Sequence, residues 1–228
     1  MPEPKRHILE EMADSTEKTI QKFSEEHSLV TAMGGLYIDT MIQIEDLKSV
    51  SSSNLPVLVI GIRNFRLLQS ASHSIYNGFY DICLILLRLV YENNLLMQYL
   101  TDNPKEAEDW LKGKRFMPSF LRKNANDKTG AYQFLSSSFT HANVECLFSG
   151  FVSKIDGDKL TAKYFPEFNE QHAKFCLNMH IVIGWISLVH LQYAFKSDLW
   201  KFEEWKNRFA DWNEIFVEHV ENHILKRK

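Results

Sequence analysis

Apolar residues recur at steps of three and four along most of this chain, which is the spacing of one face of an α-helix. The first such stretch runs from Leu9 to Val30 and predicts a long amphipathic helix. The pair Gly34-Gly35 is a point where this helix can kink or stop, before a second helical stretch that ends near Lys48. The chain therefore begins with helical structure.

The same spacing predicts further helices separated by polar breaks. A serine-rich loop precedes Pro56, a residue that the first turn of a helix tolerates. The expected helices cover about 55–73, 78–100, 104–113, 129–143, 168–196 and 199–225. In the segment 151–165, strand-like runs flank Asp156-Gly157, which is a turn signal and predicts a short β-hairpin. We therefore expect an all-α, multi-helix bundle with a short β-hairpin insertion, formed by one domain over residues 1–228.

The helix expected over 78–100 is apolar nearly all round except for a polar stripe. At about 100° per residue, Asp81, Arg88 and Glu92 fall within a narrow sector of one face. A helix that is apolar on most sides belongs in a protein interior. Unpaired charges in an interior cost several kcal/mol, so these three side chains need partners, a wet cavity or a ligand.

Composition supports a soluble globular protein with a large core. The chain has 228 residues, of which 45% are hydrophobic and 24% charged. The net charge of −3 gives no global attraction to nucleic acid or to anionic membranes. The N-terminus has no apolar signal core, and the long apolar segment Cys176–Phe195 contains polar residues that favour a core helix over a membrane span. Three widely spaced cysteines suit a reducing compartment, so we expect a cytoplasmic protein.

Arg88 and Glu92 are four residues apart and can form an ion pair along the helix. One interpretation is structural, a buried pair that fixes the register of the helix. The other is functional, in which Arg88 holds a phosphate or carboxylate and Glu92 acts as general base or orients a water. Arg63, Arg66 and His73 on the preceding helix could deepen a positive pocket, although a solvated face is the simpler explanation.

A second group of candidates lies in the segment 132–143, which contains Tyr132, Ser136 and His141. A histidine at a helix end titrates near neutral pH and can serve as acid, base or ligand. A lone histidine such as His141 is more often a structural hydrogen-bond partner. If the fold brings it against Arg88 and Glu92, the three side chains could carry out general acid–base chemistry, so we take these three as candidate catalytic residues.

The metal and cofactor signals are weak. His219 and His223 are four residues apart on the last helix, and this geometry permits a divalent ion. We expect that helix end to be exposed to solvent, however, and the sequence holds no HExxH motif, glycine-rich phosphate loop or GxSxG motif. The sequence therefore predicts no metal site and no cofactor.

The segments 86–93, 99–111 and 132–143 together resemble an uncharacterised family of bacterial helical proteins. The shared pattern is Leu-Arg-x3-Glu followed by Tyr-x2-Leu-Ser-x4-His, and the resemblance covers about residues 60–195. The chain is also distantly similar to HEPN-type bundles, many of which are metal-independent ribonucleases of toxin and phage-defence systems that use an Arg-x4-6-His motif. None of the residues shortly before His141, which include Leu135, Ser136 and Ser137, is an arginine, so Arg88 would have to supply it.

These observations lead to two functional hypotheses. The first is a binding or interaction module of a bacterial accessory or phage-defence system, with a polar pocket around Arg88, Glu92 and His141. The alternative is an HEPN-like ribonuclease that uses Arg88 and His141. The expected partner is an unknown protein or RNA and not a membrane. A homodimer is suggested by the HEPN similarity and by an aromatic stripe on the last helix, although core packing explains that stripe more simply.

Overall fold

The computed structural model describes residues 7–47, 49–125, 134–136, 153–156, 159–162 and 166–225. The helices are α1 (Ile8–Lys22), α2 (Ser24–Glu45), α3 (Leu55–Tyr76), α4 (Tyr80–Asp102), α5 (Pro104–Leu111), α6 (Pro118–Asn124), α9 (Glu170–Ala194), α10 (Lys196–Leu199) and α11 (Glu203–His219). A π-helical turn, η2 (Val220–Leu225), follows α11 directly. The all-α class expected from the sequence is confirmed.

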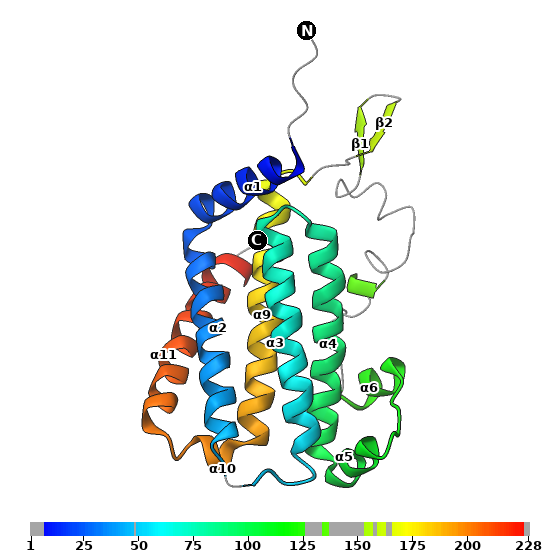
Figure 1. The fold of residues 1–228 in the computed structure, drawn as a ribbon, viewed down its shortest axis with the longest axis vertical. Helices are drawn as coiled ribbons and strands as arrows, with labels where there is room; N and C mark the ends of the chain where they lie inside the picture. The colour runs from blue at the N-terminus through cyan, green and yellow to red at the C-terminus, as the bar shows by residue number, and fades with distance from the viewer. Residues whose placement is uncertain are drawn as a thin grey trace.

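Four long helices, α2, α3, α4 and α9, lie side by side and form the body of the bundle (Figure 1). The helices α2, α4 and α9 run in one direction, while α3 and α11 run in the opposite one (Figure 1). The helix α11 packs against the outer side of α2. The short helices α5 and α6 pack against α4 near its C-terminal end.

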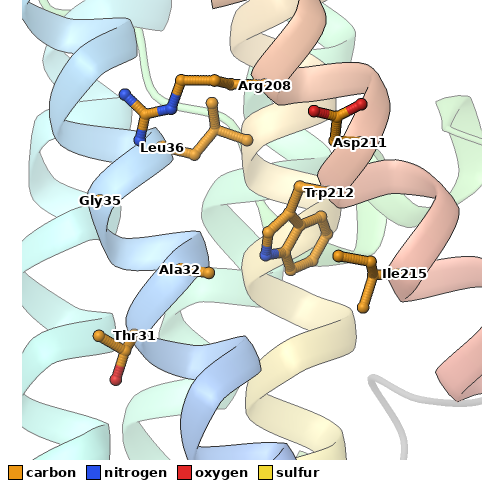
Figure 2. A pocket seen from close by; sticks show the side chains of 8 residues that line it. All are labelled: Thr31, Ala32, Gly35, Leu36, Arg208, Asp211, Trp212 and Ile215. Carbon is orange, nitrogen blue, oxygen red and sulfur yellow. The ribbon is translucent and has the colours of Figure 1, made fainter.

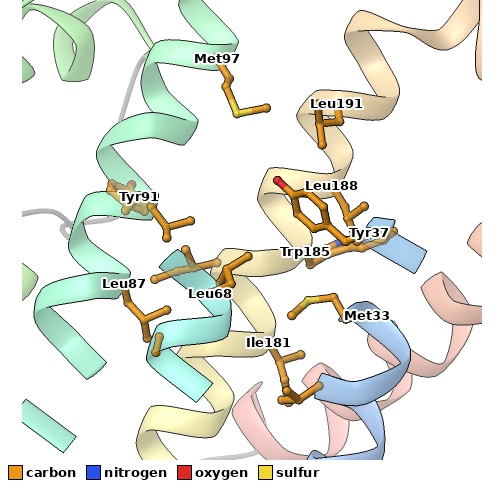
Figure 3. Close-up of a cluster of buried hydrophobic side chains, with 14 of the residues drawn as sticks. Met33, Tyr37, Leu68, Leu87, Tyr91, Met97, Ile181, Trp185, Leu188 and Leu191 are labelled. Atoms are coloured by element: carbon orange, nitrogen blue, oxygen red, sulfur yellow. The ribbon is translucent and has the colours of Figure 1, made fainter. Parts of the chain in front are cut away.

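The core lies where the four long helices meet, as Figure 3 shows. Met33 and Tyr37 come from α2, Leu68 from α3, Leu87 and Met97 from α4, and Ile181 and Leu188 from α9, and all are at most 3% exposed. Each helix thus contributes an apolar face, as the spacing of apolar residues in the sequence predicts. Because each face packs on several others, burial of these side chains fixes the relative positions of the helices.

A chain of buried hydrogen bonds runs through this apolar core. The amide of Asn64 on α3 donates to Asn94 Oδ1 on α4 (2.9 Å) and to Ser187 Oγ on α9 (2.8 Å). Asn94 donates in turn to the backbone carbonyl of Ile183 (3.1 Å), and the Tyr37 hydroxyl on α2 lies 3.0 Å from Ser187 Oγ. Four helices are therefore joined by directional contacts that apolar packing alone does not supply.

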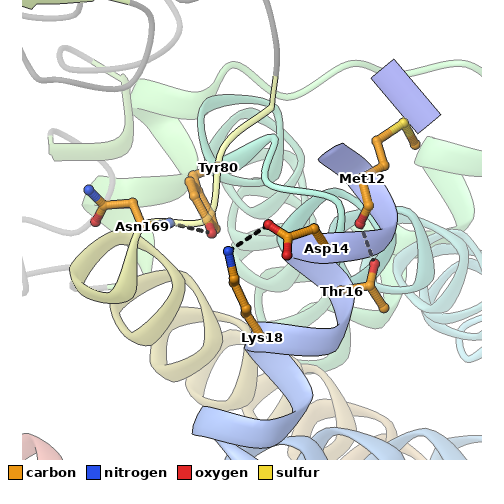
Figure 4. A network of polar contacts seen from close by, with 6 residues as sticks. All are labelled: Met12, Asp14, Thr16, Lys18, Tyr80 and Asn169. Carbon is orange, nitrogen blue, oxygen red and sulfur yellow. Dashed lines mark hydrogen bonds and ion pairs between the residues drawn. The ribbon is translucent and has the colours of Figure 1, made fainter. Parts of the chain in front are cut away.

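The helix α1 lies across the end of the bundle where α3 ends and α4 begins (Figure 1). The Thr16 hydroxyl donates to the carbonyls of Met12 (2.9 Å) and Tyr76 (3.1 Å), so it ties α1 to the end of α3. In the same region the backbone N–H of Asn169 donates to the Tyr80 hydroxyl (3.2 Å), which fastens the start of α9 to the start of α4 (Figure 4).

The prediction that the helix breaks at Gly34-Gly35 is wrong. The chain turns instead at Phe23 (φ −122°, ψ 49°), whose side chain is 5% exposed, and α2 passes through both glycines without interruption. The buried Phe23 anchors the corner between α1 and α2. Tertiary packing overrides the local preference of glycine, whose cost inside a helix is only about 1 kcal/mol.

The aromatic stripe of the last helix packs inward, and the core interpretation is confirmed. Trp205 and Trp212 are 3% and 5% exposed, and the ring of Trp185 on α9 lies 4.9 Å from Phe209, 4.7 Å from Trp212 and 5.3 Å from Phe216. The indole N–H of Trp205 donates to Thr40 Oγ1 (2.9 Å). These rings attach α11 to α2 and α9.

The strands β1 (Ser153–Asp156) and β2 (Lys159–Ala162) are antiparallel, with Ser153 paired to Ala162 and Asp156 to Lys159. They stand away from the helices (Figure 1).

One helix among the described residues, α9, is long and apolar enough to cross a membrane, with a mean hydropathy of 1.4 in its most apolar window. That window is 56% buried inside the bundle, and it carries Ser187 of the core network. These contacts are those of a core helix.

Candidate functional site

The Arg88–Glu92 ion pair forms along α4 as the sequence predicts. Arg88 Nη2 lies 2.9 Å from Glu92 Oε1, and the two side chains are 16% and 20% exposed. The pair is thus neither sealed in the core nor fully solvated. The limited exposure strengthens electrostatic interactions relative to bulk water.

Core contacts on the opposite side of α4 hold this pair in place. Leu87 and Met97 are fully buried, and Asn94 is fixed by the hydrogen bonds to Asn64 and Ile183. These residues repeat at helical spacing, so the helix cannot rotate without exposing them. The position of the Arg88 guanidinium is therefore set by a rigid element.

The other predicted pocket residues lie in more open positions. Asp81 is partly exposed, about two turns before Arg88 on α4. Arg63, Arg66 and His73 are all exposed on α3, which is the solvated face that the sequence left open as an alternative. The geometry therefore gives no support to a deep positive pocket built from α3.

Tyr132 and His141 lie outside the described residues. Ser136 is described and is half-buried in the short helical segment 134–136. Next to it Leu135 is fully buried, and the ring of Phe134 lies 5.8 Å from that of Phe175 on α9. Residues 134–136 of this segment thus pack onto the bundle at α9.

Two surface hollows flank α2. One of about 420 Å³ lies between α2 and α11 and is lined by Thr31, Ala32, Gly35, Leu36, Arg208, Asp211, Trp212 and Ile215 (Figure 2). The other, about 300 Å³, lies between α2 and α3 and includes His27, His73 and Tyr76. In it His27 Nδ1 lies 2.8 Å from the Tyr76 hydroxyl, and burial raises the pKa of Tyr76 to about 12. That phenol is therefore neutral at physiological pH and contributes hydrogen bonding only.

His180 is a buried histidine that the sequence analysis did not select. Its Nε2 lies 3.0 Å from the carbonyl oxygen of Leu68 and 3.1 Å from Ser72 Oγ. Burial lowers the pKa of His180 to about 4, since a charged imidazole would lose its hydration in the core. Its neutral ring joins α9 to α3, which is a structural role.

A cluster of possible metal ligands forms at the C-terminal end of α11. His219, His223 and Glu25 each offer one ligand atom, and these atoms all lie within 4.8 Å of one another. The expectation that this helix end is solvent-exposed is wrong for His219, which is 2% exposed because α11 packs against α2. The sequence analysis missed Glu25 because it lies 194 residues from His219.

No protein-family model, curated protein or solved structure matches this chain significantly.

Proposed function

We propose that this protein is a helical binding module whose recognition site for an anionic group centres on Arg88 and Glu92. The observation that carries the proposal is the 2.9 Å ion pair with side chains 16% and 20% exposed. A guanidinium is a planar donor that binds phosphate or carboxylate groups with defined geometry. Glu92 keeps it oriented along α4, so a ligand meets a cation that is already positioned.

A role for His141 completes this proposal. His141 follows five residues after Ser136 in the sequence, and residues 134–136 pack onto α9. In the proposed site His141 is a third polar group that hydrogen-bonds the bound anion, with Tyr132 and Ser136 close to it in sequence. The family resemblance covers about residues 60–195 of the bundle. The segment 151–165 is an insertion within that range.

The biological setting that we propose rests on that resemblance. It is a cytoplasmic accessory or phage-defence protein of bacteria, with RNA or another protein as partner and with a homodimer as its assembly. The HEPN-like ribonuclease, with Arg88 and His141 at the scissile phosphate, is the competing function. Both functions use Arg88, so binding and cleavage of RNA are measured separately to distinguish them.

Binding of a short fluorescent single-stranded RNA, followed by anisotropy, tests the site. We expect Arg88→Gln to weaken binding about tenfold or more, because each charge-assisted contact to phosphate contributes about 1.5–3 kcal/mol. The matched control is Arg63→Gln, which removes an equally charged but exposed side chain from α3 and should change affinity about twofold or less.

Gel analysis of the same RNA supplies the second measurement. Intact RNA together with Arg88-dependent binding supports the binding module. Cleavage by the wild-type protein that is lost in His141→Ala identifies the ribonuclease instead. Equal affinity of wild type and Arg88→Gln, or the absence of binding by both, would contradict an anion site at Arg88.

A further inference from the structure

The C-terminal end of α11 carries a cluster of side chains that the proposed anion site does not use. Glu25 lies in the first turn of α2, His219 ends α11, and His223 belongs to the π-helical turn η2. In Figure 1 this last turn lies behind α2, near the top of α9. The start of α2 and the C-terminal end of the α11–η2 segment, 194 residues apart in the chain, meet there.

The donor atoms lie at separations that suit a shared cation. Glu25 Oε1 is 3.0 Å from His219 Nδ1 and 3.5 Å from His223 Nε2. Around a tetrahedral zinc ion with bonds of about 2.0–2.2 Å, neighbouring ligand atoms are about 3.3–3.5 Å apart. The three donor atoms all lie within 4.8 Å of one another, so the widest pair must close to the tetrahedral separation for the side chains to surround such an ion.

The orientation of His219 is the second, independent observation. Its Nε2 lies 3.1 Å from Asn178 Oδ1 on α9, while its Nδ1 faces Glu25. With the Nε2–H donating to Asn178, the Nδ1 position faces a carboxylate oxygen, where either a proton on Nδ1 or a metal ion between the two atoms satisfies both. Histidines that bind metals are held in this way, with the second nitrogen donating to an oxygen.

Burial and local charge complete the site. The His219 side chain is 1% exposed, whereas those of His223 and Glu25 are 33% and 60% exposed, so the site has a rigid inner ligand and an open outer side. The rings of His219 and His223 stack with centroids 4.8 Å apart, and π-helical turns are frequent at functional sites. Lys174 lies close enough to affect Glu25, and the exposed Glu218 and Glu221 add negative charge on the same turns.

We propose that Glu25, His219 and His223 bind one divalent ion of the zinc class, with Asn178 as a positioning residue. Two imidazoles and one carboxylate are a ligand set that zinc accepts, and the open side leaves room for water as the fourth ligand. The bound ion joins the start of α2 to the end of α11 and the turn η2. This inference is independent of the anion site on α4.

The test uses the untagged 228-residue chain, stripped of metal with a chelator and titrated with Zn²⁺ by calorimetry and with Co²⁺ by visible absorption. We expect one ion per chain, a visible d–d band for Co²⁺, and a Tm that rises with Zn²⁺ because only the folded chain has the site. Glu25→Gln and His223→Ala should each lower the affinity at least tenfold. Both residues are partly exposed, so the variants should fold, which circular dichroism without metal checks.

Glu214→Gln is the matched control, because it removes the same charge from an exposed position of α11 that is not part of the site, and it should leave the affinity within about twofold. Asn178→Ala should weaken Zn²⁺ binding about 10–100-fold, and Asn178→Asp should restore it, which loss of a structural contact would not predict.

Three results would overturn the site. They are the absence of binding, an affinity unchanged by Glu25→Gln and His223→Ala, and intense thiolate-to-cobalt charge-transfer bands, which would place the ion at cysteines.

Discussion

At the scale of single residues, partial burial is what separates the candidate groups. Arg88 and Glu92 are reachable from solvent, His219 is buried but has polar partners on both ring nitrogens, and Asn64 and Asn94 are enclosed in the core with their amides hydrogen-bonded. A buried polar group without a partner costs about 1–3 kcal/mol, so these hydrogen bonds are needed for stability. The exposure and the partners of each polar side chain thus decide whether it is available to a ligand or holds the fold together.

Replacement of Glu92 measures how much the ion pair stabilises the fold. We expect Glu92→Ala to lower the free energy of unfolding by about 1–2 kcal/mol, between the value for a surface pair and the 3–5 kcal/mol lost when a fully buried pair is broken. Urea denaturation of both proteins measures this difference in the free energy of unfolding. The control is Glu203→Ala, which removes a mostly exposed partner of Lys206 and should cost under about 0.5 kcal/mol. A loss equal to the control would show that the pair contributes nothing to stability.

At the scale of helices, two glycines show how closely neighbouring elements approach. A Cβ at Gly61 on α3 would lie 2.7 Å from Leu191 Cδ2 on α9, whereas a Cβ at Gly34 on α2 would meet only Gln69 Nε2 at 3.5 Å. Gly61 therefore permits the close packing of α3 on α9, and Gly34 has no comparable neighbour. Periodicity in the sequence does not distinguish them, because both lie within apolar helical stretches.

Alanine substitutions at these glycines should have opposite effects. Gly61→Ala should destabilise the protein by about 1–2 kcal/mol, because overpacking costs more than the gain in helix propensity. Gly34→Ala should stabilise it by about 0.5–1 kcal/mol, since alanine is the better helix former and the space is open. Thermal and urea unfolding check both. A stabilised Gly61→Ala variant would mean that α3 and α9 do not pack as described.

At the scale of the whole molecule, buried histidines make stability depend on pH. Burial lowers the pKa values of His180 and His190 to about 4, whereas an unfolded histidine titrates near 6.5. Between these values the unfolded chain binds more protons than the folded one. Stability is therefore full above about pH 6.5 and falls as the pH drops toward 4, by about 1.4 kcal/mol per pH unit for each histidine.

His190→Gln isolates one of these contributions. Between pH 4.5 and 6, the free energy of unfolding should depend less steeply on pH in this variant than in the wild type. The difference in slope should correspond to about one fewer proton taken up on unfolding. Chemical denaturation at several pH values measures the slope. Glu25, whose pKa is lowered mainly by the hydrogen bond with His219, also loses stabilisation on acidification, but it does so equally in both proteins. Identical slopes would show that His190 is not protected by burial.

The sequence alone determined the all-α class, the short helix after Asn103, the ion pair within α4 and the inward aromatic stripe of α11. Each of these features depends on residues three or four positions apart within one helix, so the spacing in the sequence reveals it. Only the tertiary structure decided the corner at Phe23, the partial exposure of Arg88 and Glu92, the Asn64–Asn94–Ser187 network and the cluster of Glu25 with His219 and His223. The physical reason is that such contacts join helices far apart in the chain, and packing of complete helix faces sets which side chains meet.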